Sequence, residues 1–91
     1  MEKIKGILVK NGMIVVFDGV KKWYLNDLLH REEGPAITWP DGSQFWYQHG
    51  LLHREDGPAE EYSYGLKWRW LNGENMSEQE FERLIKLKSF W

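Results

Sequence analysis

The chain has 91 residues, which is long enough for one small domain with a thin hydrophobic core and too short for two. It contains no cysteine, so a disulfide framework and a thiolate zinc site are both excluded and an intracellular setting is the simpler expectation. Its formal net charge of −2 argues against a general binder of nucleic-acid backbones, which needs a surplus of positive charge. Because the sequence has no leader-like apolar start and no long apolar run, we expect a soluble, cytoplasmic protein that does not enter membranes.

The N-terminal part, residues 1–25, predicts a meander of three antiparallel strands. Apolar runs at 4–9 and 13–17 flank the segment Lys10-Asn11-Gly12, and Asn-Gly between two such runs is a strong hairpin signal. Asp18-Gly19 supplies a second tight turn, because glycine accepts the positive φ that such turns require. The third strand is then expected over 20–25.

A phrase of similar residues occurs twice in the middle of the chain, 23 positions apart. The segment from Trp23 to Ala36 ends in Leu-Leu-His-Arg-Glu-Glu-Gly-Pro-Ala, and the segment from Trp46 to Ala59 ends in Leu-Leu-His-Arg-Glu-Asp-Gly-Pro-Ala. A fixed period in this range predicts stacked copies of one supersecondary unit, here within residues 18–76. A third, degraded copy keeps the turn glycines but lacks His-Arg-Glu and Gly-Pro-Ala, as terminal units of repeat arrays often do.

Each repeat predicts strands joined by tight turns. The strands are expected over 36–39, 44–47, 59–62 and 67–71, with turns at Pro40-Asp41-Gly42-Ser43, His49-Gly50, Gly65 and Asn72-Gly73. Aromatic residues alternate with polar neighbours, which predicts strands buried on one face only; they are Trp39, Phe45, Tyr47, Tyr62, Trp68 and Trp70. Six tryptophans in so short a chain are read in two ways, as suppliers of core area or as platforms that stack a ligand.

The C-terminal part, residues 77–91, changes to a helical pattern. Ser77-Glu78-Gln79-Glu80 matches a capping box, so a helix is expected over 78–89, covering one end or face of the sheet. The predicted fold class is therefore mainly β (α+β). We expect residues 1–91 to form a single domain, an antiparallel β-hairpin repeat meander with a C-terminal capping α-helix.

The duplicated His-Arg-Glu triplet is the most chemical motif in the chain. Two copies could bind phosphates or a nucleotide, with His30, Arg31, His53 and Arg54 as the polar groups and Trp23 or Trp46 stacking on a base. In the alternative interpretation these residues do repeated structural work, with histidine bonded to the backbone and arginine paired with acids or stacked on tryptophan. A carboxylate-rich surface for a protein partner is a third hypothesis; its members would be Glu32, Glu33, Glu55, Asp56, Glu60 and Glu61.

Signatures of catalysis are weak. There is no cysteine, and none of the serines, Ser43, Ser63, Ser77 and Ser89, lies in a G-x-S-x-G elbow. No phosphate-binding Gly-rich loop is present, and the histidines of the two repeats are expected to lie too far apart to share a metal. We therefore predict no catalytic residue, no metal site and no cofactor.

The octapeptide Leu52 to Ala59, the Trp-Tyr strand before it and the closing segment 70–81 resemble small repeat proteins of bacteriophages, distantly similar to MORN and YwqK-like β-hairpin repeats. The resemblance implies a β-repeat sheet and a phage accessory role in the host cytoplasm. The leading interpretation is thus a non-enzymatic module that binds, and by binding inhibits, a host protein such as a defence component. A nucleotide-sequestering protein is the alternative, and homo-oligomerisation is left open.

Overall fold

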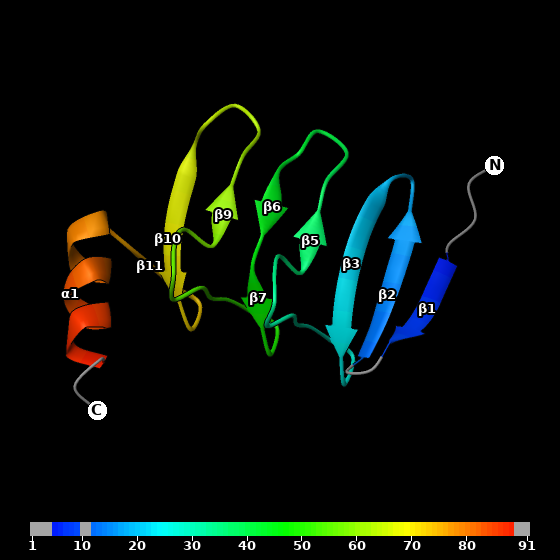
Figure 1. Cartoon of the computed structure of the whole chain (residues 1–91), viewed down its shortest axis with the longest axis horizontal. Helices are drawn as coiled ribbons and strands as arrows, with labels where there is room; N and C mark the ends of the chain where they lie inside the picture. Colours follow the sequence, from blue (N-terminus) through cyan, green and yellow to red (C-terminus); the bar gives the residue numbers. More distant parts are fainter. Residues whose placement is uncertain (1–4, 10–11, 89–91) are drawn as a thin grey trace.

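The computed structural model describes residues 5–9 and 12–88, and it is mainly β with one C-terminal helix, as predicted (Figure 1). The expected strand residue Ile4, the turn residues Lys10 and Asn11 and the helix end at Ser89 lie outside the described residues. The strands are β1 Lys5–Val9, β2 Gly12–Phe17, β3 Val20–Leu25, β4 Leu28–Leu29, β5 Ile37–Thr38, β6 Gln44–Phe45, β7 Tyr47–Gln48, β8 Leu51–Leu52, β9 Glu60–Glu61, β10 Lys67–Leu71 and β11 Glu74–Met76; the helix is α1 Glu78–Lys88.

One long antiparallel sheet runs through the molecule in the order β1-β2-β3-β5-β6-β9-β10-β11, with β4 paired to β3 and with β7 and β8 forming a separate small ladder. Figure 1 shows this order as a progression of colour from the N-terminal strand to the helix, which lies at the far end beside β10. The molecule measures 47 × 30 × 17 Å, so the sheet is a single layer. No helix in the described part of the chain is long and apolar enough to cross a membrane.

The two copies of the repeat have the same backbone bonding. Trp23 N donates to Ala36 O at 2.8 Å, and Trp46 N donates to Ala59 O at 2.7 Å. His30 N and His53 N donate to the carbonyl of the tryptophan in their own copy, each at 3.0 Å. The 23-residue period of the sequence is therefore also a period of backbone hydrogen bonding in these two copies.

The hairpin turns use the residues that left-handed backbone requires. His49-Gly50 has φ values of 52° and 80°, and Asn72-Gly73 has 50° and 80°. Two successive residues with positive φ are the mark of a type I′ turn, whose twist matches that of the paired strands. The earlier turn in the same register, Asn26-Asp27, has φ values of 52° and 64° and lacks the glycine.

The buried core is small and contains none of the described tryptophans. Its apolar members are Ala36, Ile37, Ala59 and Phe81, and its polar members are His30, Ser43 and His53. Among the described tryptophans Trp68 is exposed and the other four are half-buried, so they contribute partly buried area without entering the fully buried core. A single layer has no second sheet to cover its large side chains, so only Ala36 and Ala59, at the Gly-Pro-Ala corners, reach an exposed fraction of 0%.

The helix starts as the capping box predicts. Ser77 Oγ accepts a hydrogen bond from Glu80 N at 3.2 Å, which satisfies one of the free amides of the first turn. Glu78 and Glu80 lie in the first turn and Lys86 and Lys88 in the last, an arrangement that favours the helix dipole. Phe81 is the buried contact of this helix with the sheet end.

Candidate functional site

Each arginine of the His-Arg-Glu triplets is held by a tryptophan and a backbone carbonyl of its own repeat. The guanidinium carbon of Arg31 lies 3.9 Å from the ring centroid of Trp23, and that of Arg54 lies 3.8 Å from Trp46. Nη1 of Arg31 donates to the Pro35 carbonyl at 3.2 Å, and the equivalent bond from Arg54 to Pro58 is 3.0 Å. These contacts are the cation–π and charge-assisted bonds that the structural interpretation expects.

The glycine of each Gly-Pro-Ala corner leaves room for the guanidinium group of the arginine. A Cβ added at Gly34 would lie 3.1 Å from the guanidinium carbon of Arg31, and one at Gly57 would lie 3.1 Å from that of Arg54. Both distances are shorter than ordinary van der Waals contact. The guanidinium therefore fits between an indole ring and a glycine, and a side chain at the corner would displace it.

The buried histidines join each repeat to the next hairpin. Nδ1 of His30 accepts a hydrogen bond from His49 N at 2.9 Å, and Nδ1 of His53 accepts one from Asn72 N at 2.9 Å. The accepting nitrogen carries no proton, so each ring is held as the tautomer with hydrogen on Nε2. These bonds span 19 residues in both copies and fix the type I′ turns described above.

The two copies differ in their acidic partners. Nε of Arg54 donates to Asp56 Oδ1 at 2.8 Å, and Nη1 lies 3.3 Å from Glu61 Oε1. Among the described residues Arg31 has no carboxylate partner: Thr38 stands where the second copy has Glu61, and Glu33, the equivalent of Asp56, does not pair with Arg31.

A further acidic contact ties the second copy to the helix. Nε2 of His53 lies 3.0 Å from Glu55, whose carboxylate also pairs with Lys88 of α1. Lys88 first and His53 second lower the pKa of Glu55 below its ordinary value.

The predicted polar site does not come together as one pocket. His30, Arg31 and Trp23 are used inside the first copy, and His53, Arg54 and Trp46 are used inside the second. The six acids also fail to share a surface. Glu32, Glu33, Glu55 and Asp56 are exposed in the corner loops, whereas Glu60 and Glu61 point to opposite faces of β9.

A different feature, which the His-Arg-Glu motif does not include, dominates one side of the sheet. Directly opposed residues of antiparallel strands share a face, and the pairs Phe17–Val20, Val15–Lys22, Lys22–Ile37, Ile37–Phe45, Phe45–Glu60 and Glu60–Trp68 define it. We call this side the aromatic face; its described members are Met13, Val15, Phe17, Val20, Lys22, Tyr24, Ile37, Trp39, Phe45, Glu60, Tyr62, Trp68 and Trp70.

The rings of the aromatic face form a connected row. Trp39 and Phe45 have centroids 5.7 Å apart, Phe45 and Tyr62 are 5.3 Å apart, and both pairs meet edge to face. Tyr62 and Tyr64 extend the row at 5.5 Å, and Tyr64 is 73% exposed. Edge-to-face pairs stabilise one another beyond their buried area, so the row is held in place by its own contacts.

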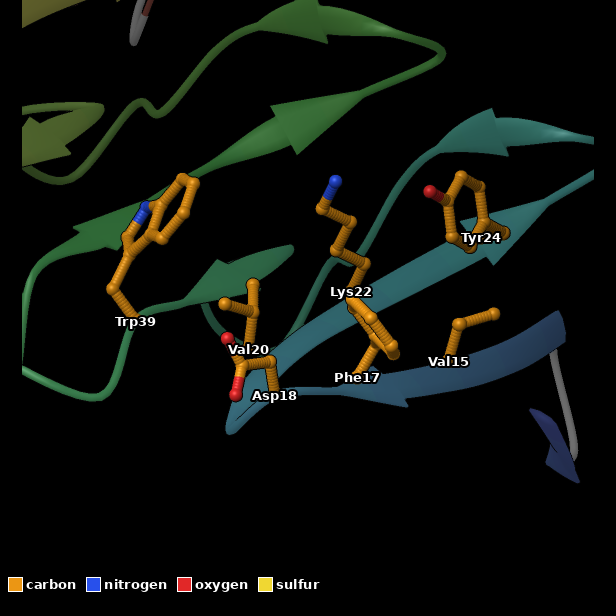
Figure 2. A pocket seen from close by; sticks show the side chains of 7 residues that line it. All are labelled: Val15, Phe17, Asp18, Val20, Lys22, Tyr24 and Trp39. Carbon is orange, nitrogen blue, oxygen red and sulfur yellow. The ribbon is translucent and has the colours of Figure 1, made fainter. Parts of the chain in front are cut away.

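Shallow grooves run along this face. One of about 410 Å³ is lined by Val15, Phe17, Asp18, Val20, Lys22, Tyr24 and Trp39, and Figure 2 shows Lys22 standing between Trp39 and Tyr24. A second, of about 450 Å³, lies on the other side of Trp39 and is lined by Trp39, Pro40, Asp41, Ser43, Phe45 and Tyr62. Their linings are mainly apolar, which suits the surface of another protein.

Glu60 is the one carboxylate among the described members of the aromatic face. It accepts hydrogen bonds from Trp70 Nε1 at 2.6 Å and from the Tyr62 hydroxyl at 2.9 Å. The bond to Glu60 also raises the pKa of Tyr62, because the carboxylate favours the protonated hydroxyl. Burial first, and the charge of Glu60 second, raise the pKa of Tyr47.

The described residues contain no group of three or more His, Cys, Asp and Glu side chains that could hold a metal ion. Comparison of the chain with protein-family models, with curated proteins and with solved structures found no match. The resemblance to MORN-like phage repeats therefore stays a prediction, and the aromatic face is the surface from which a function is argued.

Proposed function

We propose that the protein is a non-enzymatic interaction module, a phage-encoded accessory protein that binds a host protein through the aromatic face. Inhibition of a host defence component is the consequence that we expect from such binding. One observation carries the proposal, namely that a single-layer sheet leaves a connected row of aromatic side chains without a covering layer in the described chain.

The sheet lacks a second layer over the middle of its aromatic face in the described chain (Figure 1). A sheet with an apolar face is normally stabilised by packing that face against a second sheet or a helix. Here α1 lies at the end of the sheet beside β10 and leaves the middle strands uncovered (Figure 1). Exposed aromatic and apolar patches on a small protein mark interaction surfaces, and aromatic residues supply much of the binding energy in protein interfaces.

The polar groups support protein binding over nucleotide binding. The guanidinium groups of Arg31 and Arg54 already stack on tryptophan and donate to backbone carbonyls. A phosphate would have to displace those bonds in two separate repeats. The aromatic face, by contrast, has few charges to desolvate when a partner covers it.

The test is a capture experiment with matched surface variants. The purified protein is fixed to beads, exposed to host lysate, and the bound proteins are identified and then confirmed one by one with purified components. Phe17→Ser and Trp68→Ser remove two exposed side chains of the aromatic face, whose exposed fractions are 46% and 44%. Leu87→Ser on α1, at an exposed fraction of 48%, is the control.

We expect the face variants to lose the partner and the control to retain it. Retention by Phe17→Ser and Trp68→Ser, with folding verified by circular dichroism, would show that another surface binds.

A further inference from the structure

We propose that a second copy of this chain covers the aromatic face when no other partner is bound, giving a twofold sandwich of two sheets. The inference rests on the proposed role of this face in binding, and it adds a regulatory consequence. Host protein and second copy would compete for the same surface, so dissociation of the dimer would precede binding of the host protein.

The accessible surface area of the chain is larger than that of a compact monomer, as expected for a sheet whose face is covered by a partner. The accessible surface is 6645 Å², whereas a compact monomer of this mass exposes about 5,600 Å². The excess of about 1,000 Å² belongs to the whole chain, as a single-layer shape predicts, and a standard interface takes about 800 Å² from each partner. The sheet, with its 47 × 30 Å outline, is large enough to supply that area from one face.

The charges on the face are arranged symmetrically about its centre. The register places Lys22, Ile37, Phe45 and Glu60 in one row across β3, β5, β6 and β9. Lys22 and Glu60 therefore lie at equal distances from the line between β5 and β6, three strand spacings or about 14 Å apart. Within the described residues Lys22 has no ion pair.

A twofold axis between the sheets, parallel to the strands and midway between β5 and β6, brings these charges together. It places Lys22 of each copy opposite Glu60 of the other, so both lysines gain a carboxylate in one isologous contact. Packed sheets cross at about 30°, which displaces groups lying about 7 Å from the axis by only about 4 Å, within reach of a lysine side chain. At the centre, Phe45 of each copy lies opposite Ile37 of the other.

The experiment measures the mass of the pure protein by sedimentation velocity at concentrations up to about 100 µM, a range that detects micromolar dissociation constants. We expect the wild type to be a dimer. Lys22→Glu places four carboxylates across the interface, and Glu60→Lys places four lysines there. Each variant alone should raise the dimer dissociation constant at least tenfold, because opposed like charges are costly in a covered interface.

Mixing the two variants is the decisive step. In the heterodimer the carboxylate introduced at position 22 of one copy faces the ammonium group introduced at position 60 of the other. The second contact is the wild-type one between Lys22 and Glu60, so an equimolar mixture should recover a dimer of wild-type stability. Lys21→Glu is the matched control, since Lys21 precedes Lys22 on β3, pairs with Val16 and Thr38, and points to the opposite face. It should leave the dimer unchanged.

A monomeric wild type, or a Lys22→Glu variant that dimerises as well as Lys21→Glu, would overturn the inference. If Glu60→Lys fails to fold because Trp70 and Tyr62 lose their acceptor, the comparison of the two lysine variants alone decides. Failure of the dimer is distinguishable from failure of the proposed function. A monomeric protein whose capture of a host protein still depends on Phe17 and Trp68 refutes only the dimer.

Discussion

The two copies of the repeat allow one interaction to be measured against its own near-duplicate. Replacing Arg54 or Arg31 by alanine removes the same cation–π stack and the same hydrogen bond to a proline carbonyl. Only Arg54 also pairs with carboxylates among the described residues, at Glu61 and Asp56. The difference between the two variants therefore isolates the contribution of these ion pairs to the free energy of unfolding.

The magnitudes follow from the contacts. The stack contributes about 0.5–1 kcal/mol and the hydrogen bond about 1 kcal/mol, so each variant should lose about 1.5–2 kcal/mol from shared terms. Asp56 has an 85% exposed side chain, so its pair with Arg54 adds almost nothing. Glu61 is 28% exposed and should contribute about 0.5–1 kcal/mol to the second copy alone.

The assay is thermal and urea unfolding followed by far-ultraviolet circular dichroism. We expect Arg54→Ala to melt about 2–8 °C below Arg31→Ala at low salt, since 1 kcal/mol shifts the Tm of a domain of this size by about 4–8 °C. In 1 M NaCl, where the screening length is about 3 Å, the gap should close while the shared loss remains. A gap that persists in high salt, or a larger loss for Arg31→Ala, would refute this account of the repeat.

Three further substitutions test the contacts within the repeats and the contact between the second repeat and the helix. Thr38→Glu should give the guanidinium of the first copy a carboxylate and exceed Thr38→Gln by about 0.5 kcal/mol in urea unfolding, and equal stabilities would contradict the predicted pairing. Gly57→Ala should cost about 0.5–1 kcal/mol by displacing the guanidinium of Arg54, and a double-mutant cycle with Arg54→Ala should show the two losses to be less than additive. Because Lys88 and the neighbouring imidazole lower the pKa of Glu55 in the folded state, its contribution is present above the unfolded pKa and lost as the pH falls through the folded one. Glu55→Gln should therefore weaken the fold near neutral pH and flatten the decline of Tm in acid, and an unchanged acid profile would argue against this linkage.

Most of the fold prediction depended on the 23-residue period of the sequence. The period predicted the repeating unit and the turns at His49-Gly50 and Asn72-Gly73. It also favoured the structural interpretation of histidine and arginine, and the equivalent contacts in the two copies agree with that interpretation. Strand extent was less accurate. The expected strand 44–47 is interrupted at Trp46, because Tyr47 pairs with Leu52 in a separate ladder while β6 stays in the main sheet.

The candidate site was harder to predict for a physical reason. Alternation of aromatic and polar residues shows which side chains share a face, but it does not say whether a second layer covers that face. The same alternation could have separated Glu60 from Glu61, since neighbours in a strand point to opposite sides. Grouping them as one acidic surface ignored this period of two.

At the C-terminal end of the repeats a cation–π contact occurs again, but different elements supply the cation and the ring. In the register of Trp23 and Trp46 the third copy has Arg69, and its cation lies 5.8 Å from the ring of Phe81 in the helix. The aromatic partner thus comes from α1 instead of from the strand. Because Phe81 is buried and Arg69 also lies 3.8 Å from Glu78, the helix takes the place that a further repeat would occupy. In the third copy the cation lies on the strand and the ring on the helix, whereas in the first two copies the ring lies on the strand. The helix therefore covers one end of the sheet and leaves the aromatic face uncovered.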